Sequence, residues 1–68
     1  MTHTERHLLA LIAAHPGEAV TRLSELAGLP PRDITRALVA LQHHRRIRVE
    51  NVLSTRHNPV AWRSWVRE

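Results

Sequence analysis

The chain lacks cysteine, lysine, tyrosine and phenylalanine altogether, and it has only two glycines among 68 residues. Without cysteine it can form no disulfide, and it has no thiolate that could act as a metal ligand or nucleophile. No apolar run approaches the roughly 20 residues of a membrane-spanning helix. The first residues do not resemble a secretory signal, because Glu5 and two histidines interrupt a short apolar run. We therefore expect a soluble intracellular protein that does not contact membranes.

Patterns typical of catalysis are also missing from the sequence. We find no pair of carboxylates, no Ser/His/Asp arrangement and no glycine-rich phosphate loop at a recognisable spacing. A chain of 68 residues also leaves little room for a concave pocket. We expect neither an enzyme nor a bound cofactor.

All ten basic residues are arginines, and they are distributed unevenly. Residues 1–31 hold two arginines against three glutamates, whereas residues 32–68 hold eight arginines against three acidic residues. The formal net charge is +4 at pH 7 with histidine counted as neutral. A cationic second half of this kind favours a polyanionic partner.

Apolar periodicity predicts three helices, over residues 4–14, 21–27 and 31–43. Thr4 and Thr21 can cap the first two, because a threonine hydroxyl accepts a hydrogen bond from an amide in the first helical turn. Gly28 can end the second helix in the left-handed conformation. Pro31 suits the first position of the third helix, where no amide proton is needed. One apolar seam across the last two helices is expected to comprise Leu23, Leu26, Leu29, Ile34, Leu38 and Leu41.

Alternation with a period of two predicts strands over residues 47–50 and 60–66, paired as a wing over residues 47–66. Residues 18–20 are expected to form a short extended link. Trp62 and Trp65 are three residues apart, so they should lie on opposite faces of the second strand. One of them should close the core against the first or the third helix. The chain is therefore predicted to be a single α+β domain over residues 1–68, a winged helix-turn-helix with three helices followed by a C-terminal β-hairpin wing.

The third predicted helix has two distinct faces. On a helical wheel with 100° per residue, the inward side carries Ile34, Ala37, Leu38 and Leu41. The opposite side carries charged, hydroxyl and small apolar side chains, namely Arg32, Thr35, Arg36, Val39 and His43. A face that is merely solvated can have a similar composition. However, this face lies on the second helix of a helix-turn-helix, and that position favours a binding surface.

A family resemblance extends over nearly the full chain. The segment LPPRDITRALVALQHHRRIRVE, followed by NPVAW, is similar to the Z-alpha type of winged helix-turn-helix domain. The resemblance implies a recognition helix that begins at a proline and a wing that ends in a Pro-x-x-Trp segment, here Pro59 to Trp62. It also implies that Trp62 is the surface tryptophan. Thr35 and Val39 stand where that group has the asparagine and tyrosine that contact left-handed nucleic acid.

These features together predict sequence-specific binding to double-stranded DNA by a small transcriptional regulator of repressor type, cytoplasmic or associated with a nucleoid. The third helix should lie in the major groove, where arginine can bond guanine and an apolar side chain can touch the thymine methyl group. Phosphate contacts are expected from Arg45, Arg46 and Arg48. In the wing, Arg56 and His57 should contact the backbone or the minor groove. Trp62 should support Val39 or a phosphate contact.

One alternative function remains open, a protein-interaction winged helix without DNA binding of its own. Its docking surface would comprise Leu9, Ala13, Val39, Val52 and Leu53. Leu9 and Ala13 on the first helix are also candidates for a homodimer contact.

A metal site is not predicted. His3 and His7 have the i, i+4 spacing that can chelate zinc on a helix. However, His3 precedes Thr4, the expected helix cap, and the spacing of the other residues supplies no third ligand.

Overall fold

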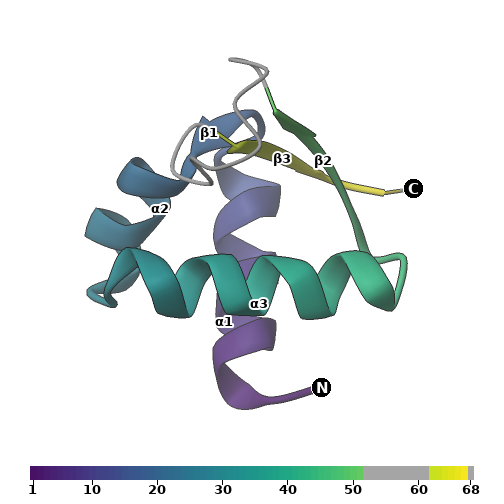
Figure 1. Ribbon diagram of the computed structural model, residues 1–68, viewed down its shortest axis with the longest axis horizontal. Coiled ribbons are helices and arrows are strands. Elements are labelled where there is room, and N and C mark those ends of the chain that lie inside the picture. Colours follow the sequence, from purple (N-terminus) through teal and green to yellow (C-terminus); the bar gives the residue numbers. More distant parts are fainter. Residues whose placement is uncertain (52–61, 68) are drawn as a thin grey trace.

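The computed structural model describes residues 1–51 and 62–67. The helices are α1 (His3–Ala14), α2 (Val20–Ala27) and α3 (Pro31–His43), and the strands are β1 (Glu18–Ala19), β2 (Ile47–Asn51) and β3 (Trp62–Val66). α3 crosses α1, and α2 lies beside the start of α3 (Figure 1). The sheet lies at the C-terminal end of α1. This arrangement confirms the predicted α+β fold of a winged helix-turn-helix. Within the described residues, no helix is both long enough and apolar enough to cross a membrane.

The sheet has three strands rather than the two of a simple hairpin. Its order is β1-β3-β2, and both pairings are antiparallel. The extended link before α2 is β1, which pairs with the central strand β3 through Glu18 and Ser64. The chain before α2 is therefore attached directly to the C-terminal strand.

The core lies between the three helices and the inner face of the sheet. Its buried apolar side chains are Leu8, Ile12, Val20, Leu23, Ile34, Ala37, Leu38, Leu41 and Ile47. The predicted seam is buried at four of its six positions. The two exceptions are Leu26 and Leu29, which are only half-buried, and Leu29 packs at the edge of the core.

α1 begins earlier than predicted because Thr2, rather than Thr4, is its cap. The Thr2 hydroxyl accepts a hydrogen bond from the amide of Glu5 at 3.1 Å and donates one to the Glu5 carboxylate at 2.8 Å. These contacts join the two ends of a Thr-x-x-Glu sequence, which is the signature of a capping box. His3 is therefore the first residue of α1 instead of lying outside it.

α2 begins at Val20, so the prediction that Thr21 caps it is wrong. Ala19 occupies the cap position and provides no side-chain hydrogen bond. The start is fixed by tertiary contacts, because β1 pairing holds the preceding residues extended and the Val20 side chain is fully buried. Gly28 ends α2 with a φ of 69°, as predicted.

The two tryptophans occupy opposite faces of β3, but their roles are the reverse of those implied by the family resemblance. Trp62 is half-buried and packs against the core. Trp65 lies on the outer face of the sheet, where the Arg48 guanidinium sits 4.5 Å from the centre of its ring. Trp62 is therefore the tryptophan that closes the core.

Gly17 is expected to be the glycine least tolerant of substitution. Its φ is 77°, and a Cβ atom there would lie 3.2 Å from Nε1 of Trp65. We expect Gly17→Ala to lower the free energy of unfolding by about 1–2 kcal/mol through left-handed strain, with a further loss from displacing the indole. Gly28→Ala is the matched control, because that glycine is also left-handed but has no atom within 4 Å. Urea denaturation of both variants measures the difference, and equal destabilisation would contradict the Trp65 contact.

Candidate nucleic-acid interface

α3 presents one buried and one exposed side. Ile34, Ala37, Leu38 and Leu41 are buried, as the helical wheel predicts. The predicted outward residues Arg32, Arg36, Val39 and His43 are all exposed. Half of the Val39 surface is accessible, an unusual exposure for an apolar side chain in the middle of a helix face. The exposed face therefore combines cationic, imidazole and apolar groups on one rigid element.

Thr35 differs from the rest of this face. It is half-buried, and its hydroxyl donates to the carbonyl oxygen of Pro31 at 3.0 Å. Its proton is used within the helix, as is common for threonine in a helix interior. Thr35 can therefore contact a partner through its methyl group or accept a hydrogen bond at its hydroxyl oxygen.

Four arginines lie on or just after α3 and are not engaged in an ion pair with any residue that the structure describes. Arg32 and Arg36 belong to α3, and Arg45 and Arg46 to the turn that follows it. All four are exposed, and neither of the ion pairs formed within residues 1–51 and 62–67 involves them. We refer to these four residues as the arginine cluster.

Arg48, predicted to be a phosphate contact, does not share this environment. Its guanidinium forms a 2.7 Å ion pair with Glu50 and stacks on Trp65. These contacts hold the Arg48 side chain on the outer face of the sheet. The spacing of residues along one strand does not predict the contact with Trp65, which belongs to the neighbouring strand. Arg48 is therefore not part of the arginine cluster.

The turn after α3 places Arg45 in a conformation that glycine usually adopts. Arg45 has a φ of 57°, and its amide donates to the carbonyl of Gln42, while the amide of Arg46 donates to that of Leu41. This pair of bonds defines a Schellman motif, in which the left-handed position favours glycine. An arginine there carries a strain of about 1–2 kcal/mol.

We expect Arg45→Gly to raise stability while lowering affinity for DNA. Relief of the left-handed strain should increase the free energy of unfolding by about 1 kcal/mol, and loss of the guanidinium should weaken duplex binding. Arg45→Lys is the matched control, because it keeps both the charge and the strain and should behave like the wild type. Urea denaturation and a duplex titration on each variant check this. A glycine variant that binds DNA as tightly as the wild type would exclude Arg45 from the interface.

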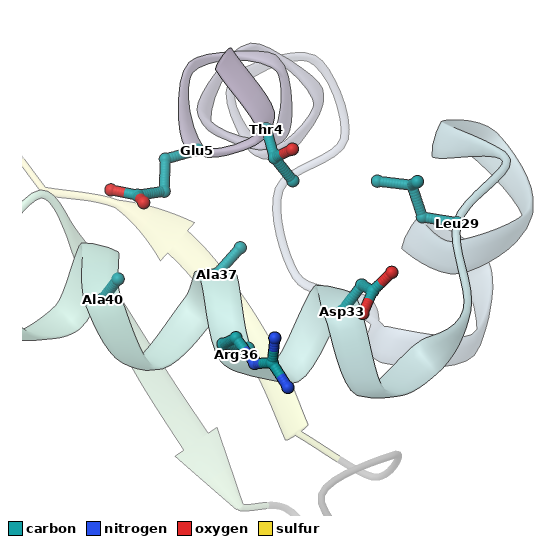
Figure 2. A pocket seen from close by; sticks show the side chains of 7 residues that line it. All are labelled: Thr4, Glu5, Leu29, Asp33, Arg36, Ala37 and Ala40. Atoms are coloured by element: carbon teal, nitrogen blue, oxygen red, sulfur yellow. The ribbon is translucent and has the colours of Figure 1, made fainter. Parts of the chain in front are cut away.

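A hollow of about 290 Å³ separates the start of α1 from α3 (Figure 2). Its lining comprises Thr4, Glu5, Leu29, Asp33, Arg36, Ala37 and Ala40. Two carboxylates, Glu5 from α1 and Asp33 from α3, border the same hollow as the Arg36 side chain. Carboxylates repel phosphate groups, so this flank of the exposed face disfavours a nucleic-acid backbone. The contribution of Glu5 was not predictable from the sequence, because only the fold brings α1 beside α3.

The remaining predicted site residues are distributed differently. Arg56 and His57 lie outside the described residues. Trp62 packs against the core, which leaves it less surface for a partner than predicted. On α1, Leu9 is half-buried against the core while Ala13 is exposed, so only part of the Leu9 surface remains for a partner.

Comparison with models of known protein families finds no match for this chain, and comparison with curated proteins likewise finds no significant match. Its function has to be inferred from the geometry of the interface described above.

Proposed function

We propose that this protein binds double-stranded DNA in a sequence-specific manner and acts as a small transcriptional regulator of repressor type. The exposed face of α3 lies in the major groove, and the wing contacts the backbone or the minor groove. The observation that carries this proposal is the exposed arginine cluster on α3 and the turn after it, together with the exposed Val39, on a helix whose opposite side is buried.

The dimensions of α3 suit a short DNA site. Arg32 and His43 are separated by three turns, or roughly 16 Å at 1.5 Å per residue. A face of that length covers about five base pairs at 3.4 Å each. Arginine can make two hydrogen bonds to guanine, and the Val39 methyl groups can contact thymine. Adjacent or dimeric copies are then needed for a site of useful length.

Three members of the arginine cluster are assigned one of two roles, contact with a base edge or contact with backbone phosphates. Arg36 lines the same hollow as the carboxylates of Glu5 and Asp33, a place unfavourable to phosphate, so its guanidinium is assigned to a base edge. Arg45 and Arg46 lie beyond the end of α3, where they are assigned to backbone phosphates that fix the register of the helix.

A titration of fluorescently labelled duplex at several salt concentrations tests DNA binding. If about six phosphates are neutralised, the logarithm of the affinity should fall with the logarithm of salt at a slope of about −5. Selection from a random duplex library should then enrich a short motif. No binding at low salt, or binding without any enriched sequence, would contradict sequence-specific recognition.

The interaction-module alternative has less support. Val39 is exposed, but Leu9 is partly covered by the core, and Val52 and Leu53 lie outside the described residues. The same titration distinguishes the two functions. An interaction module would show no salt-dependent duplex binding, and Arg32→Ala and Arg36→Ala would leave its partner affinity unchanged.

A further inference from the structure

Two histidines lie one turn apart on the exposed side of α1. The rings of His3 and His7 are nearly parallel, with 15° between their planes and 6.5 Å between their centres. Both side chains are exposed. The capping contacts between Thr2 and Glu5 fix the helical turn that carries them. His3 is the first residue of α1 and does not precede the helix as predicted, so both histidines belong to one helical segment.

The histidine pair borders a recess. A cavity of about 240 Å³ is lined by the two histidines together with Thr4, Ala27 and Leu29. No carboxylate lines it, so it offers little to calcium or magnesium, which require oxygen ligands. Imidazole nitrogen is instead a preferred ligand of zinc. The chemistry of the recess therefore favours a transition metal.

The described residues of one chain do not complete a zinc site at this position. Structural zinc sites have four ligands in a tetrahedral arrangement. Among the residues that the structure describes, no group of three or more histidine, aspartate or glutamate side chains is arranged to hold a metal. A second copy of the same chain carries a second pair of imidazoles, which would bring the number of ligands to four.

We propose that His3 and His7 form half of a zinc site, and that two copies of the protein share one zinc ion through four imidazoles. The two copies would meet across a two-fold axis, so that the same surface is used on both. The half-buried Leu29 beside the histidine pair would then be covered by the partner copy. This proposal is independent of DNA binding.

The required movement is small. Two nitrogens bound to a tetrahedral zinc at 2.0–2.1 Å lie roughly 3.3 Å apart. The centres of the two rings are 6.5 Å apart, and because both rings are exposed, side-chain rotation can bring one nitrogen of each to the separation that zinc requires. The helix backbone does not need to move.

Zinc titration followed by sedimentation velocity and metal analysis tests the site without DNA. We expect the 7.8 kDa chain to double in mass at one zinc per two chains, and to return to a monomer with EDTA. His3→Ala and His7→Ala should each weaken zinc-dependent dimerisation at least tenfold. His15→Ala is the matched control, since His15 is also exposed and follows α1 directly but lies away from the recess, and it should dimerise like the wild type.

Three results would overturn the proposal. The first is a chain that remains monomeric at saturating zinc, and the second is binding of one zinc per chain without a change in mass. The third is loss of binding in His3→Ala but not in His7→Ala, which would indicate chelation by the start of the chain instead of the pair. Circular dichroism of each variant establishes that the fold is retained, and measured duplex affinity without zinc separates this test from that of the proposed function.

Discussion

Leu38→Ala should remove a large part of the stability of the protein. The Leu38 side chain is completely buried in the centre of α3, and replacing a buried leucine by alanine typically costs about 2–5 kcal/mol. A domain of this length has a total free energy of unfolding of roughly 3–10 kcal/mol. The loss is therefore comparable with the whole stability. Thermal melting followed by circular dichroism should show a midpoint lower by at least about 10 °C.

The neighbouring residue supplies the control. Val39 is half exposed on the opposite side of the same helix, so Val39→Ala should change stability by no more than about 0.5 kcal/mol. The same change should weaken binding to a selected duplex, because it removes the methyl groups offered to thymine. If the two variants lost equal stability, the assignment of buried and exposed faces would be wrong.

Arg36→Ala and Arg46→Ala should weaken DNA binding in different ways. Loss of Arg36 is expected to cost about 1–3 kcal/mol on the selected sequence and little on random DNA. Loss of Arg46 should weaken binding to all duplexes alike and reduce the salt slope by about one. Competition titrations with specific and random duplexes at three salt concentrations measure both quantities.

A substitution at an arginine outside the arginine cluster is the control for the loss of one positive charge. Arg22 is exposed on α2 and paired with Glu25 at 3.2 Å, so Arg22→Ala should leave both sequence preference and affinity close to those of the wild type. If Arg36→Ala and Arg46→Ala behave identically on specific and random DNA, the division into base and phosphate contacts is contradicted.

Local patterns predicted α3 well. Pro31 marks its start, and the alternation of apolar and polar residues every three or four positions separates its two faces. The buried side of Ile34, Ala37, Leu38 and Leu41 follows directly from that period. Such information is carried within one segment, so no tertiary contact is needed to find it.

Features that depend on distant segments were not predictable in the same way. α2 begins at Val20 because β1 pairs with β3, more than forty residues later. Strand alternation placed Trp62 and Trp65 on opposite faces, but only the pairing of β3 with β1 and β2 and its packing on the helices show which face is inner. The stacking of the Arg48 guanidinium on the Trp65 ring is likewise a contact between two strands, β2 and β3.

The start of α1 is a different case, because a local signal was present. Thr2, His3, Thr4 and Glu5 contain the Thr-x-x-Glu spacing of a capping box, whereas Thr4 has no glutamate three residues later. Applying that rule to both threonines would have placed His3 within the helix.

The central claim is that duplex DNA contacts the exposed face of α3 and the turn after it. The most direct measurement is a titration of isotopically labelled protein with duplex, followed by amide chemical shifts. The account predicts that the largest changes occur at Arg32, Arg36, Val39, His43, Arg45 and Arg46, with little change at Trp65 on the outer face of the sheet. Changes confined to Arg48 and Trp65 on the outer face of the sheet, with none on α3, or no changes at low salt, would contradict it.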